Sequence, residues 1–250
     1  MRFFLEISYN GTAYHGWQVQ ENAHSVQQEV ENVLSQLFSG KRIETLGCGR
    51  TDTGVHARQF FLHFDLDELP FEENDFVFKL NRMLPRDIAA HHLFRVKDDA
   101  HARYDATSRS YEYHIHFRKD PFRESFSFYT PYTVDVERMN EAAGKLLTYN
   151  DFSSFCKHHT DTKTMICNVS EARWEQTKNG LVFHITADRF LRNMVRAITG
   201  TLMLAGKGVI STGEFCRIIE KKDRGSAGES MPACGLYLTN VTYPYLRNEL

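Results

Sequence analysis

Residues 49–57 read Gly49-Arg50-Thr51-Asp52-Thr53-Gly54-Val55-His56-Ala57 and place a carboxylate beside a guanidinium on a turn that glycines flank. Such a turn projects Asp52 away from the regular elements on either side, and the neighbouring Arg50 favours the ionised carboxylate. A turn of this kind can therefore present an ionised aspartate as a nucleophile. An aspartate before Thr-Gly is also ordinary turn chemistry, because it hydrogen-bonds its own backbone. The stretch by itself leaves both interpretations open.

Three catalytic templates can be compared with this segment. Asp52-Thr53-Gly54 is the triplet of aspartic proteases, which need two copies or a symmetric dimer, and the chain holds one copy. Gly47, Gly49 and Gly54 fit neither the dinucleotide fingerprint nor the phosphate loop that ends in Lys-Ser/Thr. A glycosidase needs a second carboxylate facing Asp52, which the sequence does not place. None of the three templates accounts for the segment.

Residues 49–57 resemble the signature loop of the tRNA pseudouridine synthase A family, and the resemblance extends along nearly the whole chain. Five further stretches match motifs of this family: residues 9–20 (YNGTAYHGWQVQ), 102–113 (ARYDATSRSYEY), 151–155 (DFSSF), 189–196 (RFLRNMVR), and 227–228 (AG) with 232–238 (PACGLYL). Six motifs in the same order identify the chain as a member of this family. Thr53 departs from the family pattern, where alanine is frequent, and this does not put catalysis in doubt.

The bulk composition is that of a soluble globular protein. The 250 residues are 42% hydrophobic, their mean hydropathy is -0.45, and no apolar run approaches the ~20 residues of a membrane span. Residues 1–6 do not have the form of a signal peptide, so we expect a cytoplasmic protein. The five cysteines are odd in number and form no Cys-x-x-Cys pair, which indicates neither a disulfide framework nor a zinc site.

The net charge of -2 is not typical of a nucleic-acid-binding domain, but the charge is unevenly distributed. Residues 65–75 hold six acids and no Lys or Arg, whereas residues 186–224 hold eight bases and four acids. Such a chain can present a basic groove while an acidic segment elsewhere lowers the total.

Periodicity predicts strands and helices in both halves of the chain. In an N-terminal half, residues 1–105, we expect strands at 2–9, 41–48, 59–65 and 88–97, and helices at 25–38 and 73–83. In a C-terminal half, residues 106–250, we expect strands at 107–118, 167–176, 181–188 and 235–243, and helices at 135–147, 189–205 and 211–222. The family resemblance implies an α+β fold of two similar ferredoxin-like halves that share a central, mainly antiparallel sheet flanked by helices, the pseudouridine synthase fold.

Two further patterns concern charge and aromatic side chains. On a helix starting near Arg189, the residues Arg189, Arg192 and Arg196 fall at i, i+3 and i+7 on one stripe, which favours contacts with phosphates and carboxylates over a solvated face. Tyr111 and Tyr113 share one face of their strand, for which core packing is the ordinary interpretation. The histidines at 91, 92, 114, 116, 158 and 159 form no evident ligand quartet, so we predict no metal.

Carried over to matching positions, the resemblance implies that Asp52 is the nucleophile and that Arg196 pairs with its carboxylate. Tyr111 and Leu236 would enclose the uracil ring, with Tyr111 stacked on the target base, while Tyr113 keeps its core role. The expected substrate-binding arginines, including those that would contact phosphates while the base is extruded, are Arg50, Arg58, Arg103, Arg109, Arg189 and Arg192.

The implied activity is isomerisation of uridine to pseudouridine at positions 38, 39 and 40 in the anticodon stem-loop of tRNA. The base is detached, rotated and rejoined through carbon, so no cofactor and no metal is needed. The resemblance further implies a homodimer in which tRNA contacts both subunits, with no membrane involved. Two other functions remain open at this point: an RNA-binding module without chemistry, and a carboxylate-dependent nucleoside hydrolase.

Overall fold

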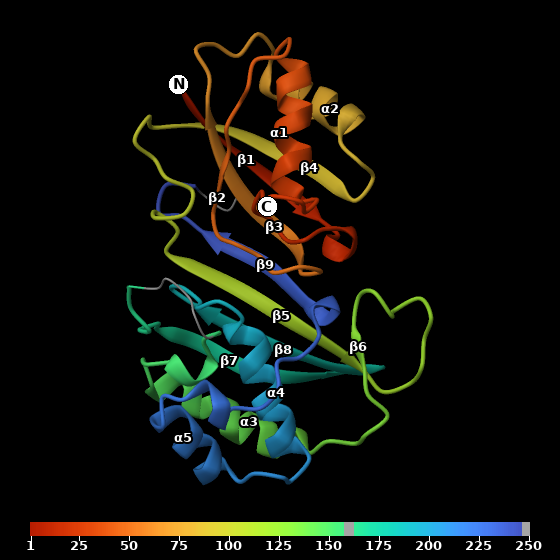
Figure 1. The fold of residues 1–250 in the computed structure, drawn as a ribbon, viewed down its shortest axis with the longest axis vertical. Helices are drawn as coiled ribbons and strands as arrows, with labels where there is room; N and C mark the ends of the chain where they lie inside the picture. The colour runs from red at the N-terminus through yellow and green to blue at the C-terminus, as the bar shows by residue number, and fades with distance from the viewer. Residues whose placement is uncertain (158–162, 247–250) are drawn as a thin grey trace. The chain divides into compact units, whose positions relative to one another are not determined.

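The computed structural model describes residues 1–157 and 163–246, and the chain divides into two compact units (Figure 1). Unit 1 comprises Met1–Thr107 and Tyr237–Leu250, and unit 2 comprises Ser108–Leu236. The first junction lies two residues beyond the expected boundary at 105/106. The last strand of the chain groups with unit 1 and not with the C-terminal half.

The strands of unit 1 are mainly antiparallel. β1 (Arg2–Tyr9) lies between β3 (His56–Asp65) and β4 (Ile88–Val96), antiparallel to both. β9 (Leu236–Thr242) runs parallel to β3, with His56 opposite Tyr237 and Ala57 opposite Leu238. The short β2 (Leu46–Gly47) pairs with β3. β9 therefore lies beside the start of β3, directly after the Asp52 loop.

Two helices complete unit 1. α1 (Val26–Leu37) begins at Ser25, whose side chain accepts a hydrogen bond from the backbone of Gln28, as an N-cap does. Its buried residues are Val26, Val30, Val33 and Leu34. α2 (Glu73–Met83) is tied to β4 through Asn81, whose amide exchanges two 2.8 Å hydrogen bonds with the backbone of Ala90.

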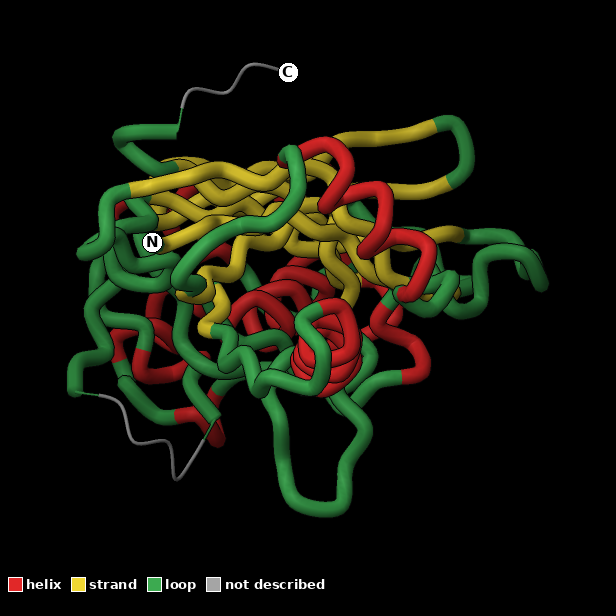
Figure 2. The backbone as a smooth tube through the Cα atoms, turned by 90° about the horizontal axis from the view of Figure 1, so that it is seen from above, coloured by secondary structure: helices red, strands yellow, loops and turns green. Residues whose placement is uncertain are grey.

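In unit 2, β8 (Gly180–Ala187) lies between β5 (Ser108–His116) and β7 (Val169–Thr177), antiparallel to both, and β6 (Phe128–Tyr129) runs parallel to β5. The helices α3 (Val136–Lys145), α4 (Met194–Gly206) and α5 (Thr212–Glu220) lie against one face of these strands, as Figures 1 and 2 show together. Short 3-10 turns occupy Gly11–Ala13, Leu146–Thr148, Ser153–Phe155, Arg224–Ser226 and Ala233–Gly235.

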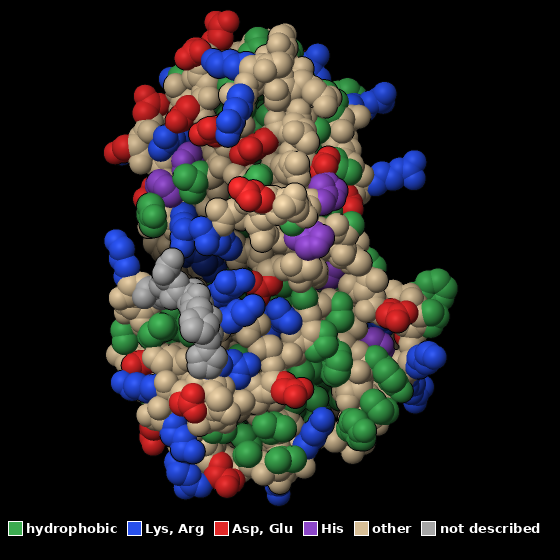
Figure 3. Space-filling model, in the orientation of Figure 1, with side chains coloured by type: hydrophobic (Ala, Val, Ile, Leu, Met, Phe, Trp, Pro, Cys, Tyr) green, Lys and Arg blue, Asp and Glu red, His purple; other side chains and the backbone are tan. Residues whose placement is uncertain are grey.

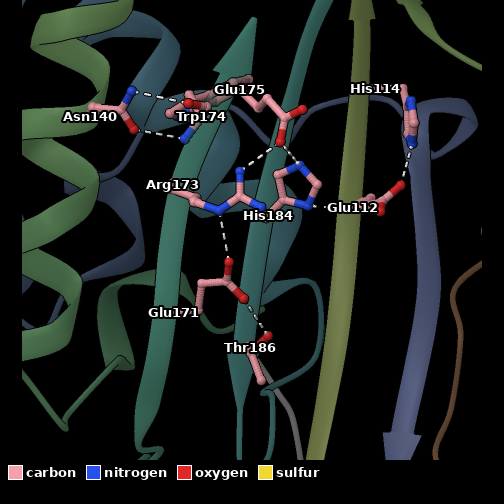
Figure 4. Close-up of polar contacts among 9 residues, drawn as sticks. All are labelled: Glu112, His114, Asn140, Glu171, Arg173, Trp174, Glu175, His184 and Thr186. Atoms are coloured by element: carbon pink, nitrogen blue, oxygen red, sulfur yellow. Dashed lines mark hydrogen bonds and ion pairs between the residues drawn. The ribbon is translucent and has the colours of Figure 1, made fainter. Parts of the chain in front are cut away.

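Alternation along the strands of unit 2 separates a core face from a polar face. Tyr113 and Phe183, which are paired neighbours on β5 and β8, are fully buried. Polar residues alternate with these core residues along β5 and β8, and together with residues of β7 and α3 they make the polar contacts drawn in Figure 4. Among these contacts, His184 lies 3.7 Å from Glu112 and 3.3 Å from Glu175, and Glu112 also contacts His114 at 2.8 Å.

The structure is α+β with a mixed, mostly antiparallel arrangement of strands flanked by helices, which agrees with a pseudouridine synthase fold. Two of the predicted elements are wrong in extent. The strand expected at 41–48 pairs only at Leu46–Gly47, and the helix expected from Arg189 begins at Met194. Within the described residues, every helix is too short or too polar to span a membrane.

Candidate functional site

The Asp52 loop in unit 1 is a turn fixed through its backbone. The carbonyl of Asp52 accepts a hydrogen bond of 3.1 Å from the backbone of Val55, and Gly54 takes a φ of +78°, which a residue with a side chain rarely adopts. Thr51 is buried, and its hydroxyl lies 2.9 Å from that of Tyr9 on β1. Asp52 itself is half-buried, at the point where the chain enters β3. The loop thus places a carboxylate near the surface on a rigid backbone.

The motif at residues 9–20 packs directly against this loop. A Cβ on Gly11 would lie 1.9 Å from the carbonyl oxygen of Val55, and one on Gly16 would lie 2.2 Å from that of Thr51. Gly54 donates a 3.2 Å hydrogen bond to the carbonyl of Tyr14. Two stretches that are 40 residues apart in the sequence therefore form one structure around Asp52.

Two polar side chains brace the same region from inside. His56 is 1% exposed, and its Nδ1 accepts a 3.1 Å hydrogen bond from the backbone of Gly11, so this nitrogen carries no proton. The hydroxyl of Tyr14 donates a 2.6 Å hydrogen bond to Asp87. Burial, followed by this bond to Asp87, raises the pKa of Tyr14 above its ordinary value, which keeps the phenol a donor.

The expected arginines of unit 1 are all exposed: Arg50, Arg58 and Arg103. The guanidinium carbon of Arg58 lies 5.1 Å from the ring centre of Tyr237, and that ring stacks on His56 at 4.6 Å. Arg58 thus lies on β3, shortly after the Asp52 loop, and its exposed guanidinium lies over the ring of Tyr237.

In unit 2, Tyr111 is half-buried on β5 opposite Ile185. The ring of Phe190 meets that of Tyr111 edge to face at 5.1 Å, and Arg109 on the same strand donates a 2.9 Å hydrogen bond to the carbonyl of Asp188. Tyr111, Arg109 and the start of the 189–196 motif thus lie together at one end of β5. Tyr113 is buried, as predicted, and donates a 2.7 Å hydrogen bond to the carbonyl of Pro232.

Arg196 lies in the first turn of α4 and is half-buried. Its Nε donates a 2.6 Å hydrogen bond to the carbonyl of Met231, whose own backbone nitrogen donates to the carbonyl of Arg196 at 3.1 Å. The segment that follows α5 is thereby fixed across the start of α4. Gly200 permits this crossing, because a Cβ there would lie 1.8 Å from the carbonyl oxygen of Glu229.

Leu236 is buried at the start of β9, directly after Gly235. A Cβ on Gly235 would lie 2.7 Å from the carbonyl oxygen of His114 and 2.8 Å from the ring of Tyr113. Residues 231–236 therefore contact both α4 and β5, and they bring the neighbourhoods of Arg196, Tyr113 and Leu236 together in unit 2.

The arginine stripe predicted from spacing is wrong. Because α4 begins at Met194, Arg189 and Arg192 precede the helix, and they do not share a helical face with Arg196. Arg189 is half-buried and Arg192 is exposed. The sequence alone did not indicate a role for Phe190 or for the carbonyl of Met231. Phe190 could have been found, because it lies within the motif at residues 189–196. The Met231 carbonyl could not, because a backbone carbonyl is present at every position of a sequence.

Charged side chains are unevenly distributed over the surface. Figure 3 shows acidic side chains gathered over the end of unit 1 that carries α2, which follows the acidic residues 65–75. On the same face, Lys and Arg side chains gather near the middle of the picture, and side chains of both signs lie over the rest of unit 2. The described residues contain no group of three or more His, Cys, Asp or Glu placed to bind a metal ion, and His158 and His159 lie outside them.

Comparison with known proteins identifies the family. Residues 142–244 match the family model described as tRNA pseudouridine synthase. The chain is 51% identical to tRNA pseudouridine synthase A of Porphyromonas gingivalis, over 97% of each chain. It is 48% identical to the Bacteroides fragilis protein of that name, over 97% of this chain and 96% of the relative, and 40% identical to the Bacillus subtilis one, over 97% and 99%. The chain therefore belongs to the tRNA pseudouridine synthase A family and is an isomerase.

Proposed function

We propose that this chain converts uridine to pseudouridine at positions 38, 39 and 40 in the anticodon stem-loop of tRNA, with Asp52 as the nucleophile. The observation that carries the proposal is similarity to enzymes named tRNA pseudouridine synthase A along nearly the whole chain, through the Asp52 loop. The rigid glycine-packed backbone around Asp52 supports this role, because a nucleophile must be held in a fixed geometry.

In the proposed reaction the bond between N1 of uracil and C1′ of ribose breaks, and a bond between C5 and C1′ forms. N1 gains a proton and C5 loses one, so the atoms balance without a cofactor, a metal or a redox step. Asp52 attacks either C1′ or the base, and both routes are retained. Since a base stacked in RNA is out of reach of Asp52, the target nucleotide is flipped out, at a cost of a few kcal/mol.

The remaining roles belong to the same proposal. Arg196 pairs with the carboxylate of Asp52, and Tyr111 and Leu236 enclose the uracil ring. The arginines that bind the rest of the RNA are Arg50, Arg58, Arg103, Arg109, Arg189 and Arg192. The proposal also includes a fold of two similar halves that share one central sheet, and a homodimeric enzyme in the cytoplasm.

Product analysis tests the proposal. Unmodified tRNA with uridines at positions 38–40 is incubated with the enzyme, and its nucleosides are identified by mass spectrometry together with strand integrity. Pseudouridine in an intact strand supports the proposal. An abasic site would identify a nucleoside hydrolase, and unchanged tRNA that is nevertheless bound would identify a binding module.

The matched variant is Asp52→Asn, which removes the nucleophile and keeps the shape of the side chain. We expect no measurable pseudouridine and a tRNA affinity within several-fold of the parent. Asp67→Asn is the control. We expect this variant to keep full activity, because Asp67 is an exposed aspartate that pairs with Lys41 at 2.7 Å. Pseudouridine formation by a pure Asp52→Asn protein would contradict the assignment.

A further inference from the structure

The turn at residues 101–105 displays a tyrosine in open solvent. Tyr104 is 76% exposed, although Ala102, two residues earlier, is fully buried. Its hydroxyl makes no hydrogen bond to the described residues, and its ring lies against the side chains of His101 and Arg103 in the same turn. Neither core packing nor hydrogen bonding among residues 1–157 and 163–246 accounts for an aromatic side chain here.

The backbone beneath Tyr104 is nevertheless held at several points. The carboxylate of Asp105 accepts hydrogen bonds from the backbone of His101 at 2.7 Å and from the hydroxyl of Tyr245 at 2.9 Å. Ala102 donates a 3.1 Å hydrogen bond to the buried His63, and its carbonyl accepts one from the hydroxyl of Tyr243. The exposed ring therefore stands on a fixed support and not on a loose loop.

His101 completes the support. Its Nδ1 accepts hydrogen bonds from the backbone of Arg103 at 3.1 Å and of Tyr104 at 3.3 Å, so this nitrogen is unprotonated. Its ring lies 4.2 Å from that of Tyr104, and the guanidinium carbon of Arg103 lies 5.9 Å from the same ring. His101 and the guanidinium of Arg103 thus both lie against the ring of Tyr104, which is nevertheless 76% exposed.

We propose that Tyr104 and Arg103 form a platform that binds an unpaired nucleotide of the substrate RNA, with the base on the phenol ring and the phosphate on the guanidinium. This inference rests on the proposed function in taking tRNA as the substrate. A ring that offers stacking beside a cation matches the two chemical parts of a nucleotide. A single ring among polar neighbours does not make the extended apolar patch that a protein partner would cover. The platform sets the position of RNA outside the reacting uridine.

The experiment measures tRNA affinity by filter binding and single-turnover pseudouridine formation for four variants of the full chain. Tyr104→Ala is expected to weaken tRNA binding about tenfold, as loss of one stacked base does. Tyr104→Phe keeps the ring and stays within about twofold of the parent, because stacking needs no hydroxyl group. Tyr132→Ala, at a tyrosine of unit 2 that is 63% exposed, is the matched control and also stays within about twofold.

Salt dependence separates the two parts of the platform. Arg103→Gln is expected to reduce the slope of log Kd against log salt by about 1, which is the change for one lost phosphate contact. Tyr104→Ala is expected to leave the slope unchanged. The inference is overturned if Tyr104→Ala binds tRNA as the parent does, or if Tyr104→Phe is impaired as much as Tyr104→Ala. An inactive parent that still loses affinity through Tyr104→Ala would refute the proposed function and leave the platform standing.

Discussion

At the scale of single residues, the Asp52 loop depends on two glycines that lie outside it. Gly11 and Gly16 let the chain of the N-terminal motif approach the carbonyls of Val55 and Thr51 to distances that no side chain permits. The motif at 9–20 therefore has a physical reason: it supports the backbone on which Asp52 stands. The matching residues were visible in the sequence, but their packing against residues 51–55 was not, because spacing alone does not say which loops meet.

We predict that Gly16→Ala destabilises the protein by about 2–4 kcal/mol, since it adds a strained φ and a backbone clash. The φ of Gly16 is +87°, and the added Cβ would meet the carbonyl oxygen of Thr51. Urea unfolding measures the change. Gly49→Ala is the control, because a Cβ at Gly49 meets nothing within 4 Å, and it should keep the parent's stability. Equal stability of all three proteins would show that the contact is relieved without cost.

His63 is 6% exposed and accepts a hydrogen bond from the backbone of Ala102. Burial, with the nearby positive charge of Arg2, lowers the pKa of His63 to about 4. In the unfolded chain a histidine titrates near 6.5, so between these values the unfolded state binds the extra proton. The contribution of His63 to stability is therefore complete above about pH 6.5 and is lost as the pH falls toward 4.

Between pH 7.5 and pH 5 this linkage amounts to about 2 kcal/mol. Urea unfolding at both pH values should show that the parent loses more stability than His63→Gln, by roughly this amount. The comparison cancels the titration of groups common to both proteins, including His101, whose pKa burial also lowers. Identical losses in the two proteins would mean that His63 accepts a proton without unfolding.

At the scale of elements, most helices and strands were predictable because their period and their caps agree. Ser25 caps α1, and Ser211 with Glu214 forms a capping box at the start of α5. The start of α4 was not predictable. The apolar and basic spacing continues through residues 189–193, but Asn193 takes a left-handed φ of +65°, and Lys157 donates a 3.1 Å hydrogen bond to the carbonyl of Arg192. Tertiary hydrogen bonds hold this segment out of the helix.

The predicted strand at 41–48 failed for a similar reason. Glu31 on α1 accepts a 2.9 Å hydrogen bond from the backbone of Thr45, and Gln27 donates one of the same length to its carbonyl. Side chains of a helix thereby satisfy backbone groups that a strand would otherwise pair with its neighbour. Hydrogen bonds between helix side chains and a neighbouring backbone leave no periodic pattern in the sequence.

The true start of α4 gives Arg196 and Arg192 different surroundings, which leads to a prediction. Arg196 is held in the first helical turn by the carbonyl of Met231, whereas Arg192 is exposed before the helix. If Arg196 pairs with Asp52 as proposed, its loss leaves that carboxylate without its partner. We expect Arg196→Ala to lower the single-turnover rate at least ~10-fold more than Arg192→Ala, with both proteins folded by circular dichroism. A greater loss from Arg192→Ala would contradict the pairing.

At the scale of the whole molecule, the question is how a chain of net charge -2 binds a polyanion. The segment 65–75 holds six acids and no Lys or Arg, and its Asp65 and Asp67 pair with Arg2 and Lys41, while 186–224 carries an excess of bases. This separation was predictable by counting residues. The face on which the bases gather depends on folding and was not predictable.

The uneven charge distribution also favours assembly of two chains around one tRNA. Two copies of a chain with separated charges can place their basic surfaces across a symmetry axis, so that one tRNA contacts both. We expect sedimentation to give twice the 29.0 kDa of one chain. We also expect log Kd for tRNA to change with log salt with a slope of at least about 3, because several phosphates are neutralised. The slope should be lower for Arg58→Gln, since Arg58 is exposed after the Asp52 loop. A stable monomer with full activity at assay concentration would remove the second subunit from tRNA binding, and a slope near zero would remove the phosphates.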